Sequence, residues 1–323
     1  MVRTIAGVAL ALAACTSGGG SSDDDGCEGA KCDSLADARP VDGDGGTVAG
    51  CAEETGALPD AWIRGGPDCG EEPEVQVHRY GASTFILRQS LCTSFEAPFL
   101  YLLFGEDRVL LEDTGAGGID VVAAVDGVIE QVLAERGQDS IDLLVVNSHG
   151  HGDHVAGNAA LEARPGTTVV GFTVGALQAA FGLEGWPDDR AEIDLGGRVV
   201  DLVPIPGHQE AHVALFDRRT GLLLTGDTLY PGRLYIDDFA TYQISMDRLV
   251  DFAHGESVCS VLGTHIEMSS TPGEDYEFGV DDHPDEHALA LDVAHLEELE
   301  AAVDAMAGAP HIEAHDDFIV YPL

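Results

Sequence analysis

The chain has 323 residues, of which 45% are hydrophobic, enough for the buried core of one large domain or two small ones. Lys and Arg together number 15 against 58 Asp and Glu, so the formal net charge is −43. A surface of this charge repels the phosphate backbone, which proteins bind chiefly through Lys and Arg, and we expect no nucleic acid partner.

The N-terminal residues are typical of an export signal. Arg3 precedes an apolar run over residues 5–14 that is too short to span a bilayer, and Cys15 follows this run. Residues 12–15, Leu-Ala-Ala-Cys, resemble the lipobox of bacterial lipoproteins, in which the cysteine is lipidated and becomes the mature N-terminus. We therefore expect an exported protein whose lipid on Cys15 anchors it to the bacterial cell envelope, at the outer membrane or its periplasmic face. An ordinary signal peptide that is cleaved nearby is the alternative.

Residues 16–74 are rich in Gly, Ser, Asp and Glu and contain few side chains that could be buried. We expect them to form a flexible, acidic linker after a signal peptide over residues 1–15. The folded domain is expected to occupy residues 75–323.

Six cysteines besides Cys15 suit an exported protein with as many as three disulfides. They are Cys27, Cys32, Cys51, Cys69, Cys92 and Cys259. Cys27 and Cys32 have no histidine or second cysteine pair near them, so we expect a disulfide there rather than a zinc knuckle. A second small loop, around Trp62, would be closed by Cys51 and Cys69.

Beyond residue 75, short apolar runs alternate with segments of helical periodicity. Apolar residues at helical spacing predict helices over residues 119–136, ended by Gly137, and over residues 285–306. The apolar runs predict strands over residues 83–88, 98–104, 109–112, 141–146, 168–171, 199–203, 213–216, 222–224, 258–262 and 318–321. Strands mixed with helices in this order indicate an α/β or α+β domain with both sheet faces covered.

A dense group of potential metal ligands follows a buried strand, in residues 147–154, Asn-Ser-His-Gly-His-Gly-Asp-His. His149 and His151 can reach one ion from a loop, while Asp153 and His154 turn toward a second. The glycines between them allow the backbone to fold tightly. Because buried imidazoles and carboxylates need partners, this density favours a metal site over a chance cluster.

Three later strands each end in a further candidate ligand: His208 in Pro-Gly-His, Asp227 in Gly-Asp, and His265 in Gly-Thr-His. A lone histidine after a strand is more often a satisfied core or surface residue. Three such positions after a His-x-His-x-Asp-His loop indicate one shared site.

These segments, with Asp113-Thr114-Gly115 after an early strand, resemble the ordered motifs of the metallo-β-lactamase superfamily. The resemblance implies an αββα sandwich of two mixed sheets flanked by helices, with two metal ions at one edge between the sheets. It assigns the first ion to His149, His151 and His208, the second to Asp153, His154 and His265, and a bridging role to Asp227. Asp113 is expected to orient the ligand loops or, alternatively, to close a turn.

The same resemblance implies a metal-dependent hydrolase in which a hydroxide bridging two divalent ions attacks a small-molecule substrate. Zinc is the expected metal, with iron or manganese as alternatives. Because β-lactamases of this superfamily generally lack the bridging aspartate, we expect an ester, lactone or thioester-like substrate. A phosphodiesterase, a β-lactamase and an iron-dependent oxidoreductase similar to the persulfide dioxygenases are the alternatives, and the oligomeric state stays open.

Asp153 and Tyr230 are the expected catalytic residues. Tyr230 lies three residues beyond Asp227, where acyl-lactone hydrolases of the superfamily carry a tyrosine that donates to the substrate carbonyl. Packing of its ring over the metal cleft is the alternative role. Residues 281–308 contain no Lys or Arg, unlike the basic cluster with which glyoxalase II-like enzymes bind glutathione, so a neutral or hydrophobic substrate is favoured over an anionic one.

Overall fold

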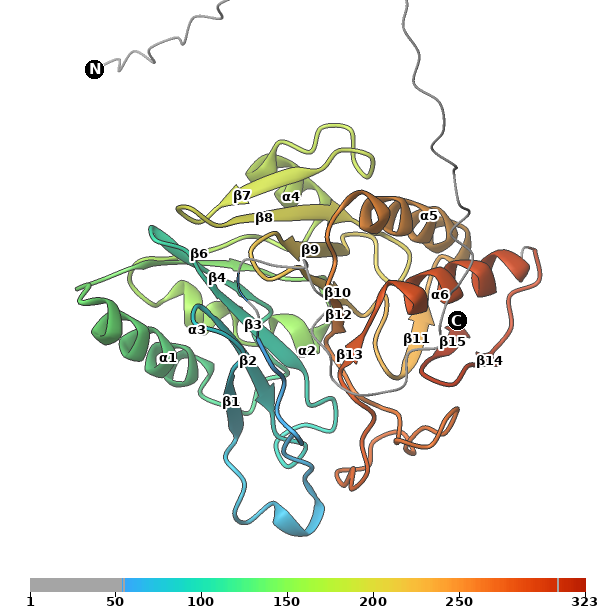
Figure 1. Ribbon diagram of the computed structural model, residues 1–323, viewed down its shortest axis with the longest axis horizontal. Coiled ribbons are helices and arrows are strands. Elements are labelled where there is room, and N and C mark those ends of the chain that lie inside the picture. The colour runs from blue at the N-terminus through green and yellow to red at the C-terminus, as the bar shows by residue number, and fades with distance from the viewer. Residues whose placement is uncertain (1–53, 55, 307) are drawn as a thin grey trace, which may run out of the picture. The chain divides into compact units, whose positions relative to one another are not determined.

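The computed structural model describes residues 54, 56–306 and 308–323 (Figure 1). Cys15, residues 16–53 of the expected linker and the Cys27–Cys32 pair lie outside the described residues. Within the described ranges, no helix combines the length and the apolar character needed to cross a membrane.

The first of two six-stranded mixed sheets has the strand order β1-β2-β3-β4-β5-β6 (Figure 1). Neighbouring strands are antiparallel except for the parallel pairs β4 with β5 and β5 with β6. The strands are β1 (Val75–Arg79), β2 (Thr84–Gln89), β3 (Phe99–Phe104), β4 (Arg108–Glu112), β5 (Asp142–Val146) and β6 (Thr167–Val169).

The second sheet has the order β13-β12-β10-β9-β8-β7, and only β10 and β12 are parallel in it. Its strands are β7 (Ala191–Asp194), β8 (Val199–Pro204), β9 (Val213–Asp217), β10 (Leu222–Gly226), β12 (Ser260–Gly263) and β13 (Ala290–Leu291). A third, small sheet that was not expected has the order β11-β15-β14. It consists of β11 (Arg233–Ile236), β14 (Glu313–Ala314) and β15 (Ile319–Pro322).

Helices cover the outer faces of the two large sheets. α1 (Val121–Arg136) shares a core with the first sheet, and α5 (Phe239–Gly255) and α6 (Val293–Ala305) share one with the second. The shorter helices are the 3-10 helix Gly66–Asp68, α2 (Gly152–Val155), α3 (Asn158–Glu162) and α4 (Val174–Phe181). The predicted αββα sandwich is therefore confirmed.

Strand β5 serves two cores because its side chains alternate between two apolar faces. Leu143 and Val145 pack with α1, whereas Leu144 and Val146 pack between the two sheets. A strand that is buried on both faces reads as a continuous apolar run in the sequence. Because β5 ends at Val146, the residues that follow it lie at the edge of the sandwich, between the two sheets.

Part of the expected linker packs on the domain. Trp62 lies edge-on to Phe99, with ring centroids 4.8 Å apart, and it extends the core between the sheets. Cys69 is bonded to Cys92, with a Cα–Cα distance of 5.4 Å, so the expected Cys51–Cys69 disulfide is wrong. The loop between β2 and β3 brings Cys92, 23 residues further along the chain, next to Cys69.

The last helix is shorter than the predicted range 285–306. It begins after Asp292, whose carboxylate accepts hydrogen bonds from two backbone N–H groups of the first turn. Leu289 belongs to the core between the sheets, whereas Leu296 and Val303 belong to the core beneath α5. The predicted helical range thus spans two different cores, and Ala290–Leu291 within it pairs as β13 with β12.

Candidate metal centre

Strand ends bring all the predicted ligands to one edge of the sandwich. The loop after β5 leads into α2, which carries Asp153 and His154. His208, Asp227 and His265 follow β8, β10 and β12, and the last two meet because β10 and β12 are parallel neighbours. The nitrogen and oxygen atoms that could bind a metal form two sets, which we call the donor groups. Within each donor group all of these atoms lie within 4.8 Å of one another.

The first group consists of His149, His151, His208 and Asp227. Nε2 of His149 lies 2.9 Å from Nδ1 of His151 and 3.1 Å from Nε2 of His208, and the latter two nitrogens are 3.0 Å apart. Burial lowers the pKa of His149 and of His208. Three imidazole nitrogens that converge in this way, two of them on neutral rings, cannot all satisfy one another by hydrogen bonds. A cation that accepts their lone pairs fits the arrangement.

The second group consists of Asp153, His154, Asp227 and His265. Oδ2 of Asp153 lies 3.2 Å from Nε2 of His154 and 3.3 Å from Nε2 of His265. Burial alone would lower the pKa of both histidines, but the carboxylates, Asp227 first, outweigh it and raise the pKa. The surroundings therefore favour positive charge, and this group too fits a divalent cation.

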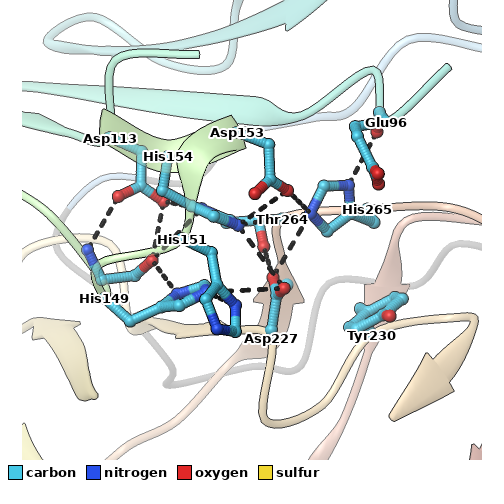
Figure 2. Close-up of polar contacts among 12 residues, drawn as sticks. Glu96, Asp113, His149, His151, Asp153, His154, Asp227, Tyr230, Thr264 and His265 are labelled. Carbon is cyan, nitrogen blue, oxygen red and sulfur yellow. Dashed lines mark hydrogen bonds and ion pairs between the residues drawn. The ribbon is translucent and has the colours of Figure 1, made fainter. Parts of the chain in front are cut away.

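Asp227 lies between the two groups and is the residue that they share in the described part of the chain (Figure 2). Its Oδ2 lies 3.8 Å from Nε2 of His149 and 3.4 Å from Nε2 of His154, and its Oδ1 lies 3.4 Å from Nε2 of His265. Burial raises the pKa of Asp227, but the surrounding imidazoles, His154 first, lower it well below the ordinary range. The side chain is therefore an anion placed to face both groups.

Hydrogen bonds on the far side of the rings fix their orientation. Nδ1 of His208 donates to the carbonyl of Tyr235 at 2.6 Å, and Nδ1 of His265 donates to the carbonyl of Glu96 at 2.7 Å. Because a carbonyl only accepts, each Nδ1 carries a proton, and Nε2 is the nitrogen that each ring turns toward its group.

Asp113 holds the loop that carries the first ligands. It is fully buried, and its carboxylate accepts from the backbone N–H of Ser148 at 2.7 Å and from its hydroxyl at 2.8 Å. Oδ2 also lies 2.7 Å from Nδ1 of His154. Asp113 adopts a φ of 63°, a left-handed conformation that Asp tolerates better than most residues. This geometry agrees with the predicted orienting role.

Two hydroxyls in the centre were missed by the sequence analysis. The hydroxyl of Thr264 donates to Asp227, and that of Ser148 lies 3.1 Å from Nδ1 of His149. Each stands directly before a histidine ligand, and this adjacency is a signal that could have found them. The carbonyls of Glu96 and Tyr235 carry no sequence signal, because every residue has a carbonyl.

Tyr230 lies beside the centre, but its hydroxyl is already used (Figure 2). The ring is 5.4 Å from that of His265. The hydroxyl donates to the carbonyl of Arg233 at 2.5 Å and lies 3.4 Å from a carboxylate oxygen of Glu267. Burial raises the pKa of Tyr230 well above its ordinary value. The structure therefore favours the packing role over donation to a substrate.

Replacing Tyr230 by phenylalanine should change turnover by no more than about threefold while lowering the free energy of unfolding by about 1 to 2 kcal/mol, because the buried carbonyl of Arg233 loses its donor. Thermal unfolding and steady-state kinetics measure the two effects, with Tyr321→Phe on β15 as the control. A large fall in turnover at unchanged stability would instead restore the catalytic role.

Glu112, at the end of β4, is a fully buried carboxyl group outside both donor groups. Neither of its carboxylate oxygens has a hydrogen-bond partner. Burial first, and the charge of the neighbouring Asp113 second, raise its pKa well above the ordinary value of 4.5. Burial therefore favours the protonated, uncharged form of Glu112 in the folded protein.

Protonation of Glu112 predicts a pH dependence of stability. In the unfolded chain the group loses its proton near pH 4.5, whereas the folded chain retains it to much higher pH. Unfolding then releases a proton, so stability falls by up to about 1.4 kcal/mol per pH unit as the pH rises above 4.5. Glu112→Gln should remove this fall, and the exposed Glu130→Gln should not. Parallel curves for Glu112→Gln and wild type would contradict the assignment.

The chain is similar to two bacterial proteins named hydroxyacylglutathione hydrolase. It is 35% identical over 144 residues to the one from Methylococcus capsulatus, a match that covers 43% of this chain and 55% of the relative. It is 29% identical over 194 residues to the one from Rhizobium meliloti, covering 59% and 72%. The chain thus spans only 55% of the length of the first of these relatives.

The fold is similar to a solved structure of TMB-1, with a TM-score of 0.50 and 13% sequence identity over 73% of this chain and 100% of that chain. At this identity the likeness shows a common fold alone. The family model described as the metallo-beta-lactamase superfamily matches residues 95–303, more than half of the chain. The chain therefore belongs to the metallo-β-lactamase superfamily.

Proposed function

We propose that the chain is a metal-dependent hydrolase that works with two divalent cations, zinc first, on an ester, lactone or thioester-like substrate. The observation that carries this proposal is the pair of donor groups that share Asp227. His149, His151 and His208 would hold one cation, Asp153, His154 and His265 the other, and Asp227 would contact both. The names of the relatives, which specify hydrolysis of an acylglutathione, support a thioester as the first substrate class to test.

When bound, two divalent cations supply a hydroxide nucleophile at neutral pH and polarise the scissile carbonyl. The contribution of the chain is to hold its donors in place before substrate arrives. The carboxylates of Asp153 and Asp227 offset part of the repulsion between two cations. The side chains of His151 and Asp153 are open to solvent, whereas His149 and His154 are fully buried, so a substrate would approach from the side of His151 and Asp153.

A substrate panel tests this function. Protein loaded with zinc should hydrolyse at least one ester, lactone or thioester, lose that activity in a chelator, and regain it when zinc is restored. Hydrolysis that resists the chelator would contradict the proposal. Cleavage of phosphodiesters or β-lactams alone, or consumption of oxygen by an iron-loaded protein, would assign the centre to one of the alternative classes.

The lipobox-like residues 12–15 support a second proposal, that the protein is exported and anchored to the cell envelope by a lipid on Cys15. Cys15→Ala should move the protein from the membrane fraction to the soluble fraction and abolish incorporation of labelled fatty acid. Cys27→Ala serves as the control. Membrane association that persists in Cys15→Ala would refute this anchor.

A further inference from the structure

Exposed aromatic side chains gather around the candidate metal centre. Only seven large hydrophobic residues of the described chain are exposed: Val77, Phe95, Phe172, Ile244, Phe278, Ile312 and Leu323. Three of them are aromatic: Phe172 lies against Gly150 of the ligand loop, Phe95 directly precedes Glu96, which contacts His265, and Phe278 packs against Phe95. Such a distribution is typical of a binding surface rather than of scattered exposed residues.

Phe95 and Phe278 form a pair on the side of the second donor group. Their ring centroids are 5.0 Å apart and the rings are nearly perpendicular, at 67°. Phe95 directly precedes Glu96, whose carbonyl accepts the hydrogen bond from His265 and whose side chain stands beside that ring (Figure 2). The pair is nevertheless open to solvent, because Phe95 is 39% and Phe278 is 69% exposed.

Phe172 lies on the side of the first donor group. A Cβ built on Gly150, between His149 and His151, would lie only 2.8 Å from Cδ2 of Phe172. The ring therefore rests on the backbone of the ligand loop, while Phe172 remains 37% exposed. The donors thus have exposed aromatic rings on both flanks.

The loop over residues 264–289, which carries Phe278, is held in place by two arginines. Arg88 is buried and pairs with Glu286. Arg233 pairs with Asp275 and also donates to the carbonyl of Tyr276. These contacts fix the loop both before and after Phe278. The loop therefore holds this ring in an exposed position.

The charges near the aromatic pair disfavour an anionic substrate. The carboxyl groups of Glu267 and Glu277 line the seam beneath the aromatic pair and add no positive charge to it. Arg233, which lines the seam beneath the two phenylalanines, is already paired with Asp275. Among the side chains that line this seam, Arg233 is the only Lys or Arg, so none remains unpaired to bind a carboxylate of the substrate.

We infer that Phe95, Phe278 and Phe172 form an apolar rim that receives the acyl chain of an uncharged thioester or ester, and that this rim sets the preference for long over short acyl groups. The inference rests on the proposed hydrolase function and specifies its substrate class. It also separates this chain from enzymes that recognise an anionic thiol such as glutathione.

Thioesters of N-acetylcysteamine, whose thiol carries no charge, test the inference in the zinc-loaded protein. The ratio of kcat/KM for the octanoyl to the acetyl ester should be about tenfold or more in wild type, because each buried methylene favours binding. Phe278→Ala and Phe95→Ala should each lower this ratio severalfold. Val77→Ala and Ile312→Ala, which truncate exposed apolar residues outside the rim, should leave it unchanged.

A binding experiment separates failure of the inference from failure of the proposed function. The octyl thioether of N-acetylcysteamine cannot be hydrolysed, and calorimetry should show that Phe95→Ala with Phe278→Ala weakens its binding about tenfold or more relative to Ile312→Ala. Equal affinity, a flat acyl-length profile in an active wild type, or a preference for S-lactoylglutathione would overturn the rim. If no thioester is hydrolysed while the thioether binds through the rim, the hydrolase proposal fails alone.

Discussion

Asp227→Asn should reduce the bound metal from about two ions per chain to about one and lower turnover by at least about two orders of magnitude. The substitution keeps the volume of the side chain but removes the only negative charge that faces both donor groups in the described structure. Two cations would then repel one another without the shared anion between them. We expect the ion at Asp153, His154 and His265 to be lost first, because three imidazoles at the other group still make a tetrahedral set with water.

Metal analysis and kinetics on the same samples measure both effects. Asp237→Asn is the matched control, because Asp237 is an exposed carboxylate just beyond β11 and belongs to neither donor group. An Asp227→Asn protein that keeps two ions and full turnover would show that the carboxylate does not join the two sites.

Asp113→Asn should weaken the affinity of the second donor group for zinc by about 10- to 100-fold, the usual effect of removing a partner that orients a ligand. Asparagine tolerates the left-handed φ of 63°, so the backbone is retained. The anionic acceptor for Nδ1 of His154 is lost, and an amide replaces one of the two oxygens that bind Ser148. Turnover should therefore recover when zinc is supplied in excess.

Competition with a chelating dye measures this affinity in wild type and variant. Asp113→Ala is the comparison, because alanine loses the same hydrogen bonds and also strains the left-handed backbone. A zinc affinity in Asp113→Asn equal to that of wild type would mean that Asp113 only closes a turn.

The metal centre could be predicted from the sequence because its donors are marked locally. Four of them lie within residues 149–154, and the other three each follow an apolar strand by no more than four residues. β8, β10 and β12 run in the same direction in the second sheet, so the residues that follow them lie at one edge. The arrangement in two mixed sheets, by contrast, was expected only from the resemblance, and the order of the strands within them was not predicted.

Other features depend on partners far apart in the sequence. Cys69 pairs with Cys92 because a loop between two strands returns to the N-terminal segment. The hydroxyl of Tyr230 is taken by the carbonyl of Arg233, an acceptor without a side-chain signature. The contact between Phe95 and Phe278 joins two irregular loops, whose paths no periodic pattern predicts.

Titration of the metal-free protein with zinc, with bound metal and hydrolysis of a thioester followed together, tests the two-ion centre most directly. Binding should saturate at about two ions per chain, and most of the activity should appear only with the second equivalent, since both donor groups are needed. Saturation of binding and of activity at one ion per chain would contradict the centre described above.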